Sequence, residues 1–166
     1  MLDGANQTGP TAVVLDTNVL IAAGFNSRSH AARVVAAVRE ARLRAIWCTE
    51  TRRESECLIR KIPPLSWSVF ADLFDEEDCH GEKLDPLAFS YVPDPADRVF
   101  AALAHATCAT LISQDDHLLA VRSKANVPFL RPHEFVRFIL GDADETLPCE
   151  PLARLTPEQP TEEAAQ

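Results

Sequence analysis

The sequence predicts an α/β fold in three layers, with helices on both faces of a central parallel sheet of about five strands. Two observations carry this prediction. Short apolar runs, of a length that suits buried strands, alternate with segments of helical periodicity along residues 12–140. Buried strands that alternate with helices are typical of parallel sheets covered on both faces. The chain has 166 residues, which fits one domain with a sizeable core.

The first predicted strand is followed by an amphipathic helix. Ala31, Val34, Val35, Val38 and Ala41 recur at helical spacing, so they fall on one face of that helix. The predicted strands cover residues 12–15, 45–48, 89–92, 110–113 and 127–130. The other predicted helices cover residues 50–61, 65–78, 95–106, 115–122 and 132–140.

The two ends of the chain differ in composition from the predicted domain at 12–140. Residues 1–11 and the Pro- and Glu-rich residues 141–166 contain too few apolar side chains to fold alone. We therefore expect a flexible N-terminus and a disordered acidic tail. The tail holds seven acidic residues and one arginine, so it contributes −6 to the net charge of −9.

The charge that remains does not exclude a nucleic-acid partner. Residues 1–140 have a net charge of only −3, and residues 28–61 carry nine basic and four acidic side chains. Residues 72–85 carry seven acids and one lysine. A basic stretch is compatible with a ligand that has a phosphate backbone. An ordinary solvated helix surface explains the same pattern equally well.

Hydropathy and cysteine usage predict a cytoplasmic protein without a membrane span. No apolar run approaches the roughly 18 residues that a transmembrane helix needs, and the N-terminus lacks the plan of a signal peptide. The five cysteines include no CxxC pair, so a zinc site is not expected. Cys48, Cys57 and Cys108 stand in apolar stretches and are predicted to be reduced core residues.

A carboxylate interrupts the apolar stretch VVLDTNVLIAAG at residues 13–24. Asp16 directly follows the first predicted strand and precedes Thr17 and Asn18. One interpretation is a helix cap, since Asp, Thr and Asn are preferred helix openers. The other is a functional carboxylate, because ligands of open α/β sheets bind beyond the carboxyl ends of the strands. Asp115 favours the second interpretation, because it lies just beyond the strand at 110–113.

Helical phase places two further acids on inward faces. Asp97 opens the helix at 95–106, although the helix dipole alone also favours an acid there. Glu54 stands on the only inward-facing stripe of its helix, where an unpaired carboxylate is costly unless a cation meets it. Asp97 shares its stripe with Phe100, Ala101 and Ala104, and Glu54 shares its stripe with Thr51, Ser55, Leu58 and Ile62.

Four carboxylates that point to one place repel each other, and a hard divalent cation is the physical reason for such a cluster. Mg²⁺ prefers oxygen ligands and keeps several waters, and four acids suffice for one or two ions. No candidate covalent nucleophile is visible, so a metal-activated water is the expected attacker. The chemistry predicted from the residues is hydrolysis of a phosphodiester bond. Glu56 is expected to face solvent, and Glu50 remains a fallback for Glu54.

Taken together, these stretches resemble the motifs of PIN-domain ribonucleases, most closely the bacterial group of toxin components of toxin–antitoxin pairs. The resemblance rests on VVLDTNVLIAAGF, the inward Glu54, DPADRVFAALA and LISQDDHLL, and it spans residues 12 to about 138. It implies an α/β/α fold, Mg²⁺- or Mn²⁺-dependent cleavage of RNA, frequent homodimers and often a neutralising antitoxin. By position, Asp16, Glu54, Asp97 and Asp115 match the family's catalytic and metal-binding acids, and Thr17, Asn18 and Ser113 match its supporting polar residues.

The last motif departs from the family pattern Thr-Gly-Asp-x-Asp. Here it reads Ser113-Gln114-Asp115-Asp116-His117, so the glycine is replaced by glutamine and the second aspartate by histidine. Loss of the glycine can change the backbone beside the metal site. Loss of the second aspartate can weaken metal binding, and Asp116 is the residue that can compensate. His117 is either a phosphate contact or a solvated surface side chain.

Two other classes of function stay open. One is a catalytically weak PIN-like domain that acts as a binding partner, which the altered last motif permits. The other is a phosphoaspartyl enzyme or receiver-like module with Asp16 as the phosphate acceptor. That class is expected to carry a second aspartate two residues on, where this chain has Asn18, or a lysine after a late strand.

Overall fold

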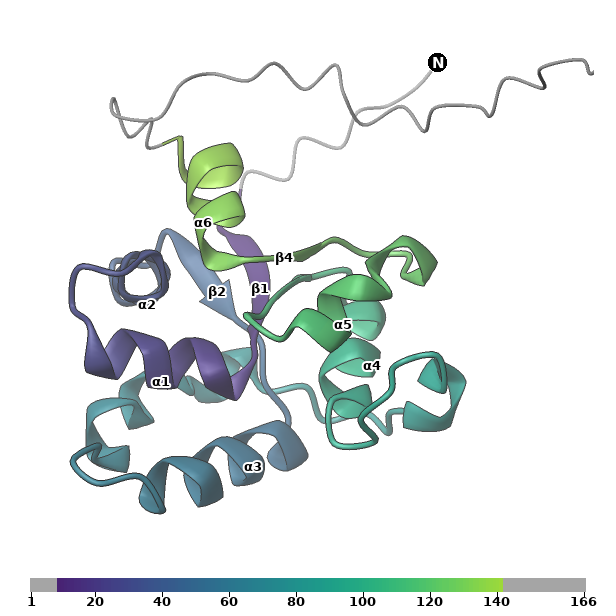
Figure 1. Cartoon of the computed structure of the whole chain (residues 1–166), viewed down its shortest axis with the longest axis horizontal. Coiled ribbons are helices and arrows are strands. Elements are labelled where there is room, and N and C mark those ends of the chain that lie inside the picture. The colour runs from purple at the N-terminus through teal and green to yellow at the C-terminus, as the bar shows by residue number, and fades with distance from the viewer. Residues whose placement is uncertain (1–8, 142–166) are drawn as a thin grey trace, which may run out of the picture.

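Four parallel strands form the central sheet of the protein (Figure 1). The computed structural model describes residues 9–141, and within them the strand order is β2-β1-β3-β4. The predicted acidic tail, from residue 142 on, and residues 1–8 of the predicted flexible N-terminus lie outside this range. The strands are β1 (Thr11–Leu15), β2 (Leu43–Ala45), β3 (Thr110–Ile112) and β4 (Phe129–Leu130).

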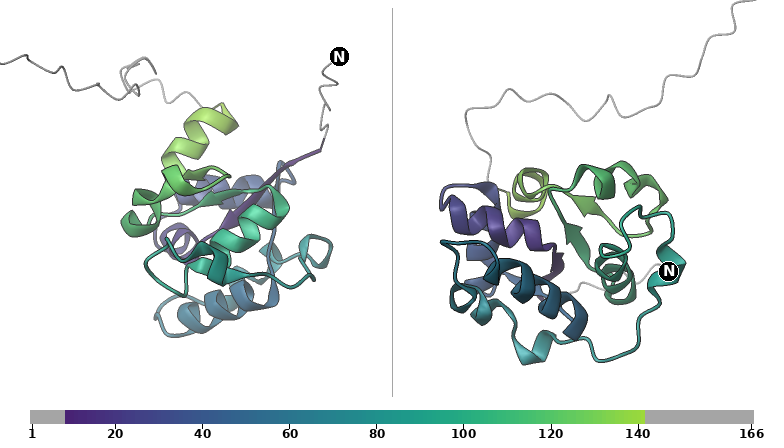
Figure 2. Two further views of the ribbon diagram at one scale, coloured as in Figure 1. Left: turned by 90° about the vertical axis from the view of Figure 1, so that its right-hand side faces the viewer. Right: turned by 60° about the horizontal axis from the view of Figure 1, so that its bottom comes forward.

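Helices cover both faces of this sheet, which confirms the predicted three-layer α/β class (Figure 2). One face packs against α1 (Thr17–Phe25), α2 (His30–Arg39), and α6 (Pro132–Phe135) with its π-helical continuation η6 (Val136–Leu140). The other face packs against α4 (Arg98–Thr107) and α5 (Asp116–Ala120).

Alternate residues of the central strands point to opposite layers. Val13 and Ile112 pack under α1, α2 and α6, whereas Val14 and Leu111 pack under α4 and α5. All four side chains are at most 1% exposed. Burying an aliphatic side chain of this size stabilises the fold by about 1.5–3 kcal/mol. The strongly apolar β1 and β3 therefore hold the sheet at its centre.

A third cluster of buried residues joins α3 (Thr49–Arg60) to the body of the domain. After α3 the chain forms three short 3-10 turns, η1 (Trp67–Val69), η2 (Ala71–Leu73) and η3 (Glu76–Asp78). Trp67, Phe70 and Leu73 of this segment pack against Leu20 of α1 and Ile59 of α3. The single helix predicted at 65–78 is therefore wrong, although Trp67, Phe70 and Leu73 do face the core.

The strand predicted at 89–92 does not form, so the described sheet has four strands instead of about five. A 3-10 turn, η4 (Pro86–Phe89), occupies this position. The turn is opened by Asp85, whose Oδ1 accepts a hydrogen bond from the Leu87 amide at 3.2 Å, and by Pro86 at the first position. The segment is apolar because Val92 is buried and Phe89 and Tyr91 pack against the core.

The second strand lies two to three residues earlier than predicted. It pairs with β1 from Leu43 to Ala45, and by Trp47 the chain has left that pairing to bridge Cys79. The sequence pattern missed Leu43 because a charged residue, Arg44, follows it. Arg44 is tolerated because β2 is an edge strand and its guanidinium pairs with Asp78 at 2.7 Å.

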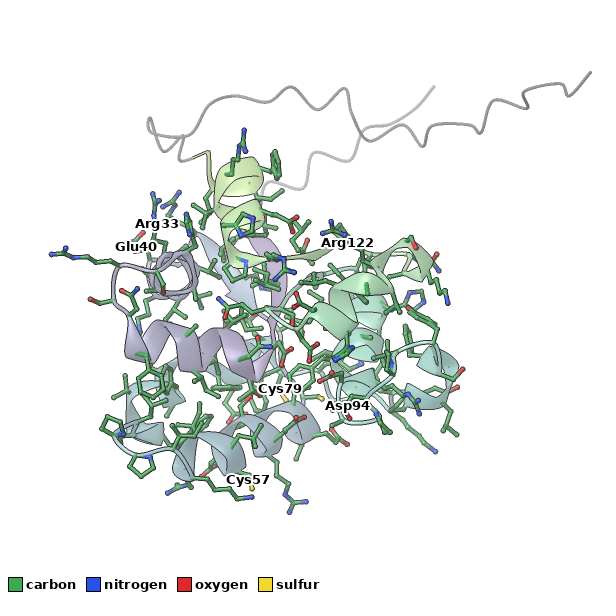
Figure 3. The ribbon with its side chains drawn as sticks, in the orientation of Figure 1. Arg33, Glu40, Cys57, Cys79, Asp94 and Arg122 are labelled. Atoms are coloured by element: carbon green, nitrogen blue, oxygen red, sulfur yellow. The ribbon has the colours of Figure 1, made fainter. Side chains whose placement is uncertain are left out.

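Two of the three cysteines predicted to lie in the core are exposed. Cys48 is buried, but Cys57 points outward from α3 (Figure 3) and Cys108 ends α4 at the surface. Across residues 9–141, no helix is long and apolar enough to cross a membrane.

Candidate active site

The site lies at the carboxyl ends of β1 and β3, the two central strands. The chain leaves β1 toward β2 on one side, and it returns later to β3 on the other side. This is the switch point of an open α/β sheet, where loops diverge and leave a crevice. Asp16 directly follows β1, and Asp115 follows β3. The sheet therefore brings together two acids that are about a hundred residues apart in sequence.

Asp16 is buried, with 5% of its surface exposed, and it holds the N-cap position of α1. Its side chain makes no capping hydrogen bond of ordinary geometry. Instead, the Ser113 hydroxyl donates to Asp16 Oδ2 at 2.7 Å. Burial raises the pKa of the Asp16 carboxyl more than the hydrogen bond from Ser113 lowers it. Helix capping alone therefore does not account for this carboxylate, although the backbone amides of Thr17 and Asn18 also lie near enough to lower its pKa.

Ser113 connects the two strand ends. While its hydroxyl donates to Asp16, the same oxygen accepts from the Asp115 amide at 3.0 Å and from Asn18 Nδ2 at 3.5 Å. Asn18 Oδ1 in turn accepts from the Gln114 amide at 3.1 Å. The predicted supporting residues Asn18 and Ser113 thus hold the loop after β3 against the loop after β1.

Asp115 has a structural role of its own as the cap of α5. Its Oδ1 accepts from the backbone amides of His117 at 2.7 Å and Leu118 at 3.4 Å. Its Oδ2 has no hydrogen bond to any residue within 9–141. One carboxylate oxygen therefore fixes the side chain, and the other is available to a ligand.

Asp97 begins α4 at the opening of the same crevice, and 9% of its surface is exposed. Its side chain makes no capping hydrogen bond, and it forms no ion pair with any residue in the described range. The predicted neighbours Phe100, Ala101 and Ala104 are all buried. Helix capping therefore does not explain this acid either.

Glu54 is half-buried on α3, but its expected companions are only partly right. The buried residues of α3 are Thr51, Ser55 and Ile59, whereas Leu58 is 39% exposed. Glu54 therefore lies at the edge of the inward face and not at its centre. Thr17 and Ser55 explain the rotation of the helix, because their buried hydroxyls are 2.8 Å apart in a hydrogen bond that joins α1 to α3.

Burial and the charges of neighbouring acids raise the pKa values of Asp16, Glu54 and Asp97. The pKa of Glu54 rises to about 7, first because of burial and then because of the charges of Asp16, Asp97 and Asp94. The pKa of Asp97 also rises to about 7, for burial and then for the charges of Asp16, Asp94 and Asp115. Asp16, Asp97 and Asp115 are among the charges that produce these shifts, so the four predicted acids stand within electrostatic reach of one another.

Asp94 is a fifth acid that the sequence reading missed. It lies between α3 and α4 (Figure 3) and acts electrostatically on both Glu54 and Asp97. Its Oδ1 accepts from the Ala96 amide at 2.9 Å, so it opens a turn in the loop before α4. No periodicity marks a loop residue, and its position three residues before Asp97 was the only available signal.

The remaining acids of interest are exposed or bound by an arginine. Glu56 pairs with Arg60 at 2.7 Å, and the exposed Glu50 stands in the first turn of α3. Asp116 was expected to support the site, but its exposed carboxylate is bound by Arg131. Among the glutamates of α3, the repulsion from Asp16 and Asp97 acts on Glu54.

The donor chemistry suits a hard divalent cation, because four carboxylates stand within electrostatic reach of one another and neither Glu54 nor Asp97 has a cationic partner among residues 9–141. In that range, however, no three Asp, Glu, His or Cys side chains stand close enough to hold an ion as they are placed. Repulsion between the carboxylates is a sufficient reason for this spacing. An ion would have to draw them inward.

A match to a known protein family identifies the fold of this chain. The family model described as PIN domain matches residues 12–117, which contain all four clustered acids. The chain belongs to the PIN-domain family. Its fold is similar to that of a chain in the structure of FitAB bound to IR36 DNA fragment, with a TM-score of 0.50 and 17% sequence identity. That match covers 72% of this chain and 94% of the other. No curated protein matches this chain.

The altered last motif of this PIN domain is accommodated without backbone strain. Among residues 9–141, only Ala41 and Cys108 are non-glycine residues with positive φ, so Gln114 does not need the freedom of a glycine. His117, which replaces the second aspartate, lies near enough to Asp97 for its charge to lower the pKa of that acid. His117 therefore belongs to the surroundings of the site.

Proposed function

We propose that this chain is a Mg²⁺- or Mn²⁺-dependent endoribonuclease that hydrolyses RNA phosphodiester bonds with an activated water. Asp16, Glu54, Asp97 and Asp115 would hold the ion or ions. The observation that carries the proposal is the convergence of four acids from four elements, two of them with a pKa of about 7 and no cationic partner within the described residues. Members of the PIN-domain family are generally nucleases, which supports the same reaction class.

Each residue has a role that follows from its contacts. Ser113 orients Asp16 and the Asp115 amide, and the cap of α5 fixes one oxygen of Asp115. The hydrogen bond between Thr17 and Ser55 holds α3 so that Glu54 faces the crevice. A bound divalent ion would supply the positive charge that offsets the four carboxylates and the Lewis acidity that activates water for attack at phosphorus.

We further propose that the chain is the toxin of a toxin–antitoxin pair, acting in the cytoplasm as a homodimer and neutralised by a cognate antitoxin. The support is the similarity of its motifs to that group of PIN domains and the likeness of its fold to a chain of the FitAB complex with DNA. The cheapest observation that tests it is the neighbouring reading frame, where a small DNA-binding protein is expected.

The second candidate function is a catalytically weak PIN domain that works by binding. Two observations favour it: no three potential ligands in residues 9–141 already stand at metal-holding positions, and Asp116 is engaged by Arg131. This candidate predicts RNA or protein binding without turnover.

Cleavage of labelled single-stranded RNA separates the two candidates. The full chain is incubated with Mg²⁺, with Mn²⁺ or with EDTA, beside an Asp16→Asn variant. The nuclease cleaves with either ion and is silent in EDTA, and the variant is inactive under all conditions. Equal cleavage by the wild type and the variant would indicate a contaminating nuclease, and RNA binding without cleavage would support the second candidate.

A further inference from the structure

A basic groove of about 740 Å³ is lined by residues that take no part in the proposed activation of water. We call it the basic groove, and its principal lining residues are Arg28, His30, Gln114, Arg131 and His133. They come from three segments, namely the loop before α2 with the first residue of α2, the loop after β3 and the start of α6. No acidic residue lines the groove. In a chain of net charge −9, a lining with two arginines, two histidines and no acid is distinctive.

The cationic groups of the basic groove are available to a ligand. Arg28 is exposed, and its guanidinium forms no ion pair with any residue among 9–141. Arg131 pairs with Asp116, whose side chain is 82% exposed. Exposed pairs of this kind contribute only about 0–1 kcal/mol, so an incoming anion can replace Asp116. The rings of His30 and His133 meet edge to face at 6.1 Å and add N–H donors between the two arginines.

Hydrogen bonds connect the basic groove to the acidic cluster. Gln114 lines the groove, and Asp115 follows it directly in the sequence. Its amide donates to Asn18 Oδ1 at 3.1 Å, and Asn18 Nδ2 donates to Ser113 Oγ at 3.5 Å. Ser113 is the residue that donates to Asp16. The basic groove and the acids therefore share the loop after β3, where Gln114 of the groove is the neighbour of Asp115.

We propose that the basic groove binds backbone phosphates of an RNA strand on one side of the bond that is cleaved. The inference rests on the proposed function and assigns the substrate-binding residues of the same site. Repeated phosphates fit a groove with two arginines, two histidines and no acid, since arginine binds phosphate through two parallel hydrogen bonds. The acids beside the groove repel the same backbone, so cations next to them are needed to hold it.

The test measures binding separately from cleavage. Fluorescence anisotropy of a labelled single-stranded RNA is recorded with the full chain in EDTA, where the proposed reaction cannot proceed. The variants are Arg28→Ala and the matched control Arg42→Ala. Both arginines are exposed, and both substitutions remove one positive charge. Arg42, however, lies beyond the opposite end of α2, roughly 15 Å away for a helix of ten residues.

Arg28→Ala should raise the Kd for RNA by roughly five- to tenfold. The slope of log Kd against log salt concentration should fall by about 1, the amount expected for the loss of one phosphate contact. Arg42→Ala should change the Kd less than about twofold, because only the long-range field is altered. His133→Ala should weaken binding in the same direction as Arg28→Ala. Equal effects of Arg28→Ala and Arg42→Ala, or no effect of either, would overturn the proposal.

Two further measurements separate this inference from its alternatives. Poly-glutamate is added as a competitor, and displacement of RNA at equal charge concentration would make the groove a site for acidic protein segments and overturn the assignment to RNA. With Mn²⁺, Arg28→Ala should raise KM and leave kcat near the wild-type value. If the wild type does not cleave RNA at all, the proposed function fails, whereas the binding series in EDTA still tests the groove.

Discussion

At the scale of single residues, the four clustered acids differ in how the fold uses them. Asp115 caps a helix with one oxygen and Asp16 accepts a hydrogen bond from Ser113. Glu54 and Asp97 make no hydrogen bond or ion pair through their carboxylates to any residue in 9–141. Burial first, and the charges of neighbouring acids second, raise the pKa values of both groups. A structural role therefore explains Glu54 and Asp97 less well than it explains Asp16 and Asp115.

The three glutamates of α3 give a matched set for testing this view. Glu54→Gln should weaken Mn²⁺ binding and lower the RNA cleavage rate by orders of magnitude, because Glu54 is half-buried and lies within reach of the charges of Asp16 and Asp97. Glu56→Gln breaks an exposed pair with Arg60 and should change neither property. Glu50→Gln should cost at most about 1 kcal/mol at the start of the helix. Metal-dependent cleavage and Mn²⁺ titration measure all three, and an inactive Glu50→Gln beside an active Glu54→Gln would require the site to be redrawn.

The raised pKa values also predict how stability depends on pH without metal. Glu54 and Asp97 have folded-state pKa values of about 7, above their ordinary values of 4.5 and 3.8. Between those limits the folded state binds more protons than the unfolded state, so the free energy of unfolding falls as the pH rises through this window. Urea unfolding in EDTA should therefore show higher stability at pH 5.5 than at pH 8.

Two variants identify the groups responsible for that pH dependence. Asp97→Asn removes one of the titrating carboxyls and should flatten the profile. Asp72→Asn is the control, because its pairing with Arg39 lowers the pKa of the Asp72 carboxyl and so acts in the opposite direction. Stability that rises from pH 5.5 to pH 8 in the wild type would contradict the electrostatic account of the cluster.

At the scale of elements, the orientation of α3 depends on one buried hydrogen bond. Ser55 and Thr17 are 1% and 2% exposed, and their hydroxyls bond across the gap between α3 and α1. Ser55→Ala leaves the Thr17 hydroxyl unsatisfied and should destabilise the fold by about 1–3 kcal/mol. Because α3 is then less firmly held, Glu54 is less well placed and cleavage should fall as well.

A hydrogen bond of the same type at the surface provides the control for Ser55. Ser66 and Ser68 also bond through their hydroxyls at 2.8 Å, but both are exposed. Ser66→Ala should therefore change the stability by less than about 0.5 kcal/mol. The comparison is made by urea denaturation and RNA cleavage, and equal effects of the two substitutions would argue against a positioning role for Ser55.

How much could be predicted from the sequence also varies by element. β1 and β3 were predictable because they are apolar throughout, and Asp16 and Asp115 followed from the ends of these strands. The edge strand β2 was predicted two to three residues too late, because Arg44 interrupts its apolar pattern. The partner that neutralises Arg44 lies elsewhere in the chain and could not be seen in the local sequence. The apolar segment at 89–92 packs on the core without pairing to a strand. Composition alone cannot distinguish such a segment from a buried strand.

The site shows the same limit. Helical phase selected Glu54 but misjudged Leu58, because the rotation of α3 is set by its tertiary contact with Thr17. Asp94 and the effect of His117 on Asp97 depend on which loops meet in space, and neither leaves a periodic signal in the sequence. The basic groove likewise combines three segments that are distant along the chain.

At the scale of the whole molecule, charge is unevenly distributed. Residues 141–166 contribute −6 of the net charge of −9 and contain few apolar side chains. Truncation after Leu140 should therefore leave the Tm nearly unchanged. It should also strengthen RNA binding at low salt, because a repelling charge is removed, and this gain should vanish at high salt.

A full-length variant with the seven tail acids replaced by their amides separates charge from chain length. It should bind RNA as tightly as the truncated protein. Anisotropy titrations at two salt concentrations and thermal unfolding provide the readouts. A fall of many degrees in Tm on truncation would instead mean that the tail stabilises the domain.

The central claim is that the four carboxylates act together to hold a divalent ion for RNA cleavage. The most direct test is the rate of RNA cleavage by Asp97→Asn as a function of Mn²⁺ concentration, with the Tm in EDTA recorded on the same preparation. The variant should be inactive at every Mn²⁺ concentration while its Tm equals or exceeds that of the wild type, because a repulsive charge has been removed. Cleavage that reaches the wild-type rate at saturating Mn²⁺ would contradict the claim and remove Asp97 from the site.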